Sequence, residues 1–474
     1  MSRQAPAHAP TDRPAGWRLA AFASLQVAIG AASMPITAYV PAFYAQHLGM
    51  GLGAVGLVFM LTRLWDAFND PLIGYFSDQT RSRWGRRKPW ILAGLPLYAA
   101  AVWVVFLPQG SPSPLALGIA LSVLYLGWTM FSIPHMAWSG EISGHYHERT
   151  RVQTYVAAAG ALGLLLVLGL PVLLDQTGHG DPRLKLAVMG GFVVVATALT
   201  GAAALLSFRE LPAPPRPKVR LGIRRALAFL VTDRLLQRVL VSDFLVTLGQ
   251  LTRGSLLIIF LTSYMGLAKA ASLVLFTQYF FGVFAGPIWL RISYRLGKHK
   301  TLIAAELTQS AINFTLLLVT PSAWPLLVAL TIAQGLTQSS GNLMLRAMVA
   351  DVADKQRLES GEERAGVLFS IFSLTGKAGQ AVAVGIAFPL IGALGYSATG
   401  ANTAEGLLGL KLVFALGPAL AHLASAALLW RYPLDQARHA EIRHALDARD
   451  AEIAQPPRPR AAALTPQHPV LGDA

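Results

Sequence analysis

The feature that most constrains this sequence is a series of apolar segments that recurs along nearly its whole length. Each segment is about 20 residues long, which is enough for a helix to cross the hydrocarbon core of a bilayer. Of the 474 residues, 54% are hydrophobic and 13% are charged, whereas a soluble domain usually carries about 25% charge. The sequence therefore predicts an all-α polytopic membrane protein.

The apolar segments can be placed as twelve membrane helices in two groups of six. We expect the first group near 18–45, 52–77, 90–107, 115–139, 152–174 and 186–207, and the second near 239–265, 270–293, 301–320, 324–350, 365–393 and 408–430. This placement divides the chain into a disordered tail (1–17), a six-helix bundle (18–208), a Pro- and Arg-rich connection with an amphipathic piece (209–238), a second six-helix bundle (239–431) and a second tail (432–474).

The basic residues alternate from loop to loop. The chain has 39 Lys and Arg against 24 Asp and Glu, a net charge of +15, and 31 of the 39 lie in the tails or in loops after even-numbered helices. The positive-inside rule then places both termini in the cytoplasm, with the chain in the cell (inner) membrane. This distribution accounts for the charge without a nucleic-acid partner. Five basic residues remain within apolar segments: Arg63, Arg253, Arg346, Lys377 and Lys411.

A weak repeat relates the two groups of helices. The junction after the second helix reads DPLIGYFSDQTRSRWGRRK, and the junction after the eighth reads GPIWLRISYRLGKHK. In each, a Pro-containing helix end leads into a Gly–basic turn at a corresponding place in its half. Related halves around a midplane cavity are typical of major facilitator carriers, whose substrate site lies between the halves. We therefore expect the major facilitator fold.

Two acids on one apolar helix predict a cation site. Asp66 and Asp70 are one turn apart, so their Cβ atoms lie about 5–6 Å from one another on one helix face. In a dry environment two such carboxylates cannot both stay ionised without a cation or a proton between them. Pro71 is expected to loosen the helix and free a backbone carbonyl nearby. The alternative is a structural ion pair with Arg63 or Lys377 and no bound cation.

The same stretch, RLWDAFNDPLIGYFSDQTRSRWGRRKPW, resembles the signature of the glycoside–pentoside–hexuronide:cation symporters. Three further stretches resemble the same family and fall in matching order: IPHMAWSGEISGHYHERTR after the fourth helix, MVADVADKQRLESGEERAG after the tenth, and SLTGKAGQA in the eleventh. The resemblance covers residues 20–430.

The resemblance implies a set of residues for the coupling cation. In the family, the two helix-two acids and the Asn between them line the cation site, and they match Asp66, Asn69 and Asp70. A helix-four Thr that contributes an oxygen matches Thr129, and the helix-eleven Lys that neutralises the acids matches Lys377. Carboxylate, amide and hydroxyl oxygens are hard ligands suited to a small cation. The implied coupling ion is Na⁺ or H⁺, with no other metal or cofactor.

The sequence departs from the family where sugar would bind. A helix-one Asp that holds sugar aligns with Gly30, a helix-four Asp aligns with Ser132, and the start of the fifth helix, TYVAAAG, lacks an Arg. The cation machinery is therefore expected to be retained and the sugar pocket to be changed. The substrate-binding candidates are Trp128, Ser132, His135 and Arg253.

Three of these candidates have a second interpretation. Trp128 either stacks on a ring-shaped ligand or packs against other aromatic residues. His135 faces either the cavity or a neighbouring helix. Arg253 lies near the centre of the seventh helix, where it contacts either an anionic group on the substrate or an internal acid.

Charged residues in the loops after even-numbered helices are expected to form a cytoplasmic gate. Their salt bridges would form and break as the halves rock. Arg346 and Lys411 lie near helix ends and are expected to snorkel, and Glu306 is expected to be structural. The gate residues are Asp78, Arg86, Arg87, Glu141, Arg149, Asp351, Asp354 and Arg364.

The predicted function is cation-coupled symport of a small organic solute by alternating access. The expected solute is a glycoside, sugar derivative or sugar acid, and the carrier is expected to work as a monomer in the lipid bilayer. An alternative cargo is an amphiphile such as a lysolipid, which distant relatives of the family carry. A receptor or an enzyme is the remote alternative. The absence of HExxH and GxSxG motifs and of a large soluble domain argues against an enzyme, and with no cysteine there is no disulfide or thiolate site.

Overall fold

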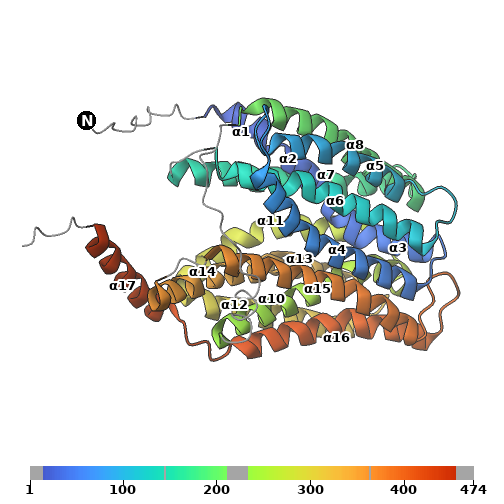
Figure 1. Cartoon of the computed structure of the whole chain (residues 1–474). Helices are drawn as coiled ribbons and strands as arrows, with labels where there is room; N and C mark the ends of the chain where they lie inside the picture. Colours follow the sequence, from blue (N-terminus) through green and yellow to red (C-terminus); the bar gives the residue numbers. More distant parts are fainter. Residues whose placement is uncertain (1–13, 143–145, 211–232, 362–364, 455–474) are drawn as a thin grey trace, which may run out of the picture.

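The computed structural model describes residues 14–142, 146–210, 233–361 and 365–454, among which there are helices and no strands. The first group of helices (Figure 1) consists of α1 (Gly16–Ala23), α2 (Leu25–Met34), the π-helical turn η1 (Pro35–Tyr39), α3 (Val40–Gln46), α4 (Leu52–Gln79), α5 (Lys88–Phe106), α6 (Pro114–Ser139), α7 (Tyr146–Gln176) and α8 (Pro182–Ser207).

The second group begins with α10 (Arg234–Ile259). It continues with the π-helical turn η2 (Phe260–Tyr264), α11 (Ala271–Leu296), α12 (Lys298–Thr315), the short 3₁₀ turn η3 (Leu316–Leu318), α13 (Trp324–Gln338), α14 (Ser340–Ser360), α15 (Ala365–Ala393), α16 (Ala404–Leu429) and α17 (Gln436–Ala454).

Ten helical segments of the described chain are long and apolar enough to cross a membrane, which agrees with a polytopic membrane protein. The helices α1 to α3 form one of these spans, Gly16–Gln46, and α10 with η2 forms another, Arg234–Tyr264. Two predicted spans fall outside the ten. The helix α4 carries Arg63, Asp66 and Asp70 near its middle, which lowers its hydropathy, and the tenth predicted span is divided at Ser339.

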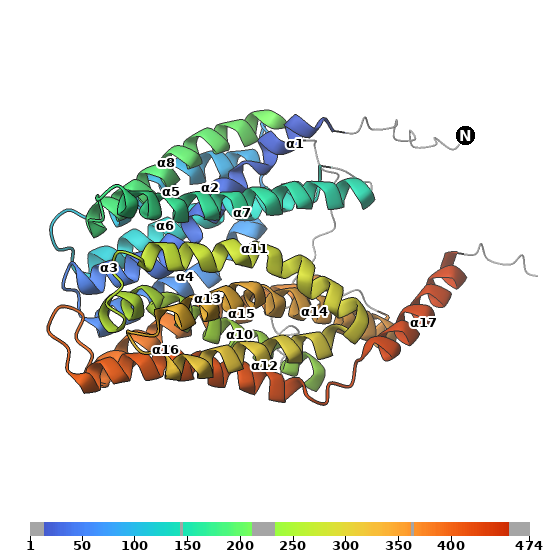
Figure 2. The same cartoon turned by 180° about the vertical axis from the view of Figure 1, so that it is seen from behind.

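Most of α1–α8 lies in the upper part of Figure 1 and most of α10–α16 in the lower part, and α4 and α11 lie in the middle, where the two groups meet; Figure 2 shows the same division from behind. We call the two groups the first and second halves, and we count α17, which packs on α14, with the second half. They contact one another through α4 with α15, α7 with α11, and η1 and α3 with α10. The end of the molecule where α1 begins and α16 ends is called the basic end, and the other is called the opposite end.

The halves are joined at the opposite end by a polar contact. Gln46, the last residue of α3, donates from Nε2 to the hydroxyl oxygens of Thr262, Ser263 and Tyr396, at 3.3 to 3.4 Å. Ser263 and Tyr396 also share a hydrogen bond of 2.8 Å. All three partners of Gln46 belong to the second half.

Glycines bring α4 and α15 close together near the same end. A Cβ atom on Gly56 would lie 2.8 Å from Cδ of Pro389, and one on Gly385 would lie 2.7 Å from Sδ of Met60. Small residues at such contacts let membrane helices pack with their backbones close together. This packing fixes the position of α4 along the axis of α15, and both helices carry residues of the candidate cation site.

Several helices start at side-chain caps that the sequence supplies. An oxygen of the capping residue accepts a hydrogen bond from a backbone N–H of the first turn, which satisfies one of the donors that a helix leaves free. The capping residues are Ser113 for α6, Asp181 for α8, Asp233 for α10 and Thr403 for α16.

Some predicted boundaries differ from the structure. The fifth helix begins at Tyr146 rather than near 152, and the seventh begins at Arg234, so the end of the predicted amphipathic piece is the first turn of α10. The tenth predicted helix is two helices, the second of which extends to Ser360. Pro71 lies inside α4, which continues through it as one helix. The predicted disorder at 1–13 and 455–474, and the connection at 211–232, lie outside the described residues.

Candidate cation and substrate sites

Four side chains from three helices meet where α4 contacts α15. Asp66 and Asp70 lie one turn apart on α4, and Nζ of Lys377 on α15 lies 2.8 Å from Oδ2 of Asp66 and 2.6 Å from Oδ2 of Asp70. Thr129 on α6 donates from Oγ1 to the other carboxylate oxygens, at 3.2 Å from Asp66 and 3.0 Å from Asp70. Lys377 also donates to the backbone carbonyl of Asp66 at 3.3 Å.

A second basic residue balances the charge of this cluster. The guanidinium of Arg63 lies 3.9 Å from Asp66 and 4.5 Å above the ring of Tyr125. With both acids and both bases ionised, the four charges sum to zero. The ammonium of Lys377 thus occupies the position between the carboxylates that a small cation would need, so the structure contains the ion pairs of the alternative interpretation.

The cluster is buried unevenly. Asp66 is 4% exposed and Thr129 is fully buried. The side chains of Asp70 and Lys377 are 22% and 18% exposed, respectively. A cation would therefore arrive from the side of Asp70 and Lys377, and the oxygens of Asp66, Asp70 and Thr129 would hold it once Lys377 moved away. These are hard oxygen ligands of the kind that small cations prefer.

Two further buried polar groups flank the cluster. Asn69 is 3% exposed, and its Nδ2 atom has no hydrogen-bond partner. Asp243 on α10 is also 3% exposed with an unpaired Oδ2, and a Cβ atom on Gly376, next to Lys377 in the chain, would lie 3.2 Å from that oxygen. Sequence reasoning missed Asp243, although an acid inside an otherwise apolar helix was the available signal. No set of three potential metal ligands occurs among the described His, Asp and Glu residues.

The structure does not bring the four substrate candidates into one pocket. Trp128 is half-buried, and its ring lies edge-on to Tyr98, with 5.8 Å between centroids. His135 faces the neighbouring helix α1, where its Nε2 lies 3.0 Å from the carbonyl oxygen of Phe22 and its ring stacks on Phe22 at 4.4 Å. Ser132 is half-buried on α6.

Arg253 contacts an amide rather than an acid. It is 1% exposed, and its Nη1 donates to Oδ1 of Asn313 on α12 at 3.0 Å. Its guanidinium carbon lies 5.3 Å from the ring centroid of Phe414 on α16. Nε and Nη2 have no partner, and no ion pair joins Arg253 to an acid of the described chain. Arg253 therefore points toward helices of its own half.

Gly30 occupies a position where a side chain does not fit. It lies on α2 against Gly160 of α7, and a Cβ atom on Gly30 would lie 2.1 Å from the carbonyl oxygen of Gly160. Real Cβ atoms do not approach backbone atoms so closely. The aspartate that family resemblance places here therefore cannot be accommodated without moving α2 from α7.

Residues 21–436 match the family described as MFS/sugar transport protein, which covers most of the chain. The chain belongs to this family. This match confirms the predicted family resemblance. Similar proteins of known name include cation symporters, which confirms that part of the prediction as well.

Two curated relatives show the range of cargo among similar carriers. The glucuronide carrier protein homolog of Escherichia coli strain K12 is 26% identical, covering 86% of this chain and 90% of its own. The sodium-dependent lysophosphatidylcholine symporter 1 of Gallus gallus is 22% identical, covering 92% of this chain and 91% of its own. A crystal structure of the nucleoside transporter NupG aligns with a TM-score of 0.66 at 14% identity, over 88% of this chain and 99% of that one, and thus supports the fold.

The transporter also contains a polar cluster that sequence reasoning missed. Gln250 on α10 donates to the backbone carbonyl of Gln338 at 2.9 Å, at the break between α13 and α14. The side chain of Gln338 accepts from Gln278 at 2.9 Å and donates to the hydroxyl of Tyr279 at 3.2 Å, both on α11. Ser339, the residue at the break, is exposed. The run QSSGN at 338–342 was the available signal. Interrupted membrane helices are typical of substrate sites in transporters.

Four of the predicted gate residues of the first half, Asp78, Arg86, Arg87 and Glu141, form one cluster. Arg86 lies 2.6 Å from Glu141, and Arg87 lies 3.3 Å from Glu141 and also pairs with Asp78. Burial raises the pKa of the Glu141 carboxyl, but the hydrogen bonds and charges of Arg86 and Arg87 outweigh burial and hold the pKa below its ordinary value. Glu210, which sequence reasoning missed, accepts the backbone N–H of Arg87 at 2.8 Å.

The gate residues of the second half pair with other partners. Lys298 lies 2.5 Å from Asp351, and His439 of α17 lies 3.0 Å from Asp354. Arg443 of α17 lies 3.4 Å from Asp354. Each described cluster at the basic end thus lies within one half. The side chain of Arg149 and the whole of Arg364 lie outside the described residues.

The remaining charged residues of the apolar segments are placed as follows. Arg346 is exposed. Lys411 is 8% exposed, with its ammonium 5.1 Å from the ring centroid of Tyr264, so it is buried against an aromatic ring rather than extended to solvent. Glu306 on α12 and His422 on α16 are both fully buried, with 2.6 Å between Oε2 and Nδ1.

Proposed function

We propose that this chain is a secondary active transporter that couples Na⁺ or H⁺ to the uptake of a small hydroxylated solute, such as a glycoside, sugar derivative or sugar acid. The observation that carries the proposal is the bridge from Lys377 on α15 to Asp66 and Asp70 on α4, which places a cation-sized position between two acids at the contact of the halves. The glucuronide carrier homolog among the relatives supports the class of solute.

In the proposed cycle the cation and Lys377 compete for the same carboxylates. A cation bound by Asp66, Asp70 and Thr129 releases the ammonium of Lys377, and the charge it adds makes the cluster positive unless Lys377 moves or loses its proton. Binding of the ion therefore weakens the link between α4 and α15 and changes the cavity beside them. Coupling of this kind is reciprocal, so the solute tightens binding of the cation by the same factor.

The arrangement of contacts supports a state open toward the basic end. The halves are joined at the opposite end by Gln46, while the described ion pairs of the basic end each remain within one half. We place the basic end in the cytoplasm by the positive-inside rule, with the transporter in the cell membrane as a monomer. Counting α4 and the pair α13–α14 as spans gives twelve, in two six-helix bundles at 18–208 and 239–431.

The neutral cluster of Gln250, Gln338 and Tyr279 is the proposed contact for solute hydroxyls. Amides and phenols both donate and accept hydrogen bonds, so they match neighbouring hydroxyls on a sugar ring. Ser339 at the break is exposed and provides one further hydroxyl. The close approach of Gly30 to Gly160 leaves no room for the helix-one aspartate that the family resemblance implies at this position.

A lysolipid remains the second candidate cargo, because a sodium-dependent lysophosphatidylcholine symporter is among the relatives. The two cargoes predict different ligands for the purified protein. A ligand that binds the native state raises the melting temperature by mass action. Glycosides and glucuronides should therefore raise it in the presence of Na⁺ or at low pH, and lysophosphatidylcholine should not.

The test of coupling is uptake into proteoliposomes driven by an inward Na⁺ or proton gradient. Asp66→Asn and Asp70→Asn should each abolish accumulation of the identified solute, whereas Asp447→Asn, an exposed acid of α17, should leave it unchanged. Accumulation against a gradient by either of the first two variants would show that the cation site is elsewhere.

The test of the solute site uses the same ligands. Gln338→Ala should remove the melting-temperature shift caused by the solute and preserve the shift caused by the cation. Gln79→Ala, an exposed glutamine at the end of α4, should preserve both shifts. A normal solute response in Gln338→Ala would assign the solute to another part of the cavity.

A further inference from the structure

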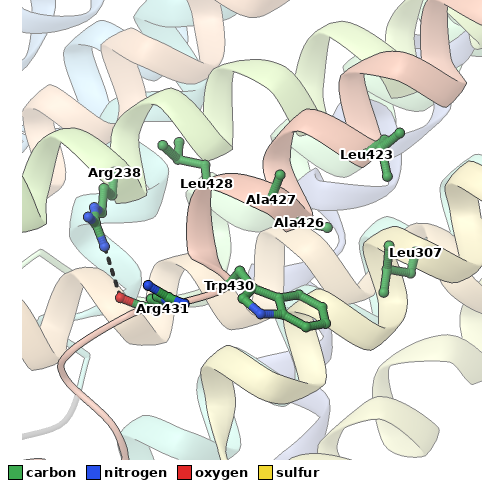
Figure 3. A pocket seen from close by; sticks show the side chains of 8 residues that line it. All are labelled: Arg238, Leu307, Leu423, Ala426, Ala427, Leu428, Trp430 and Arg431. Carbon is green, nitrogen blue, oxygen red and sulfur yellow. Dashed lines mark hydrogen bonds between the residues drawn. The ribbon is translucent and has the colours of Figure 1, made fainter.

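A groove lies on the outer face of the second half, away from the contact between the halves. It has a volume of about 540 Å³ and is formed by α10, α12 and α16 near the basic end (Figure 3). Its apolar wall includes Leu307, Leu423 and Ala426, and its other end is lined by Arg238, Trp430 and Arg431. No residue of the first half lines it, so it is distinct from the proposed cation and solute sites.

The polar end of the groove holds two arginines. Arg238, in the second turn of α10, donates from Nη1 to the backbone carbonyl of Arg431 at 2.9 Å, as the dashed line in Figure 3 marks. No ion pair joins either guanidinium to an acid within the described chain. The nearby acid Asp233 is already engaged, because it caps α10 and accepts a hydrogen bond from Gln356 at 2.8 Å. By contrast, Arg357 in the same region is paired with Asp450 at 3.0 Å.

The two ends of the groove lie at different depths of the proposed membrane. Leu307 and Leu423 are 39% and 40% exposed on membrane-spanning segments, so they face lipid tails. Trp430 directly follows the last residue of α16 and is 66% exposed, which is the position of the aromatic residues that mark the membrane–water interface. The arginines therefore lie at the level of lipid headgroups and the leucines at the level of acyl chains.

We propose that this groove binds an anionic phospholipid, whose phosphate lies between Arg238 and Arg431 and whose acyl chain follows Leu307 and Leu423. The two neighbouring guanidinium groups form no ion pair with a described acid, so they repel each other. A phosphate would remove that repulsion and accept hydrogen bonds from both guanidinium groups. Basic pockets between membrane helices on the cytoplasmic side are suited to anionic headgroups. A bound lipid would hold the start of α10 to the end of α16.

The test is a lipid titration of the purified full-length transporter, followed by native mass spectrometry. The probes are phosphatidylglycerol and phosphatidylcholine with identical acyl chains. The wild type should bind phosphatidylglycerol at least tenfold more tightly. The double variant Arg238→Gln, Arg431→Gln should lose that preference, and glutamine can still donate to the carbonyl of residue 431, which protects the fold. The double variant Arg291→Gln, Arg295→Gln, which removes two exposed arginines of α11 at the same end, should keep the preference.

Two further measurements separate the sources of binding. Inorganic phosphate at millimolar concentration should not displace the lipid, because it lacks the acyl chain; efficient displacement would overturn the assignment to a lipid. Leu423→Trp fills the apolar wall without changing charge, so it should weaken both lipids. Equal binding of the two lipids by the wild type, or an unchanged preference in the Arg238–Arg431 double variant, would also overturn the proposal.

Discussion

The ammonium of Lys377 lies 2.6 Å from the carboxylate of Asp70, although the two residues belong to different halves of the molecule. Among the ion pairs between described residues, those that join the halves are the pairs of Lys377 with Asp70 and with Asp66. Whatever ion binds to the two acids must therefore alter a contact between the halves. In the proposed cycle, ion binding and the relative movement of the halves are therefore linked by the side chain of Lys377.

The first prediction tests that link by a double-mutant cycle. Lys377→Ala leaves two close acids without their shared base, so it should lower the melting temperature and abolish cation-driven transport. Asp70→Asn, combined with it, should recover part of the stability because it removes the excess negative charge. We expect the effects to be non-additive by about 0.5–3 kcal/mol, the usual coupling of residues in contact. Lys411→Ala with Asp70→Asn is the control and should be additive. Additive effects of Lys377→Ala and Asp70→Asn would remove Lys377 from the mechanism.

The second prediction concerns helix packing at Gly30. Gly30→Ala should lower the free energy of unfolding by roughly 1–3 kcal/mol, because its Cβ atom would overlap the backbone of Gly160 and overpacking costs about that much. Gly191→Ala, on α8, is the matched control, since nothing lies within 4 Å of its added Cβ atom. Thermal unfolding in one detergent compares the two. Equal stability of both variants would contradict the close approach of α2 and α7.

The third prediction concerns the buried pair of Glu306 and His422. Removing one partner of a buried hydrogen bond leaves the other partner unsatisfied, which costs roughly 1–3 kcal/mol. Glu306→Ala should therefore lower the melting temperature strongly, whereas Glu359→Ala, an exposed acid of α14, should change it little. Glu306→Gln should lie between them, since an amide can still hydrogen-bond to the ring. A stable Glu306→Ala variant would show that the pair contributes little.

The fourth prediction is a pH dependence at Glu141. Its folded-state pKa is held below the ordinary value, after the opposing effect of burial, by Arg86 and Arg87. A lowered pKa adds stability above the ordinary carboxyl value of about 4.3, and that stability is lost as the pH falls through the lowered folded value. Because the Glu141 side chain is 25% exposed, its contribution at pH 7 should be about 0.5–1 kcal/mol.

The measurement compares the melting temperature of wild type and Glu141→Gln from pH 7 to pH 3. The difference should be present at pH 7 and disappear at the acid end. Glu441→Gln, which removes an exposed acid of α17, should show a smaller difference at every pH. If the difference between Glu141→Gln and wild type stays constant down to pH 3, the variant loses stability through changed packing rather than through the lost charge.

The sequence by itself determined the class of protein and predicted the candidate cation residues. Apolar segments of membrane length have few folds available to them, so the order of the helices followed from hydropathy alone. Asp66 and Asp70 share a helix face by their spacing, and the stretches around Thr129 and Lys377 resemble a known family. The spacing of the two acids contained its own physical reason, whereas Thr129 and Lys377 were predicted from the family resemblance.

Only the tertiary structure decided which charges meet and which positions remain open. His135 faces α1, Arg253 contacts Asn313, and Lys411 lies against Tyr264. These contacts depend on how each helix is rotated about its axis and on which helices pack against it, and the sequence alone does not determine either. The break at Ser339 and the fit of Gly30 against Gly160 also depend on helices distant in the chain. Partner choice in a membrane protein is a matter of packing and burial between helices, and these exist only once the helices are assembled.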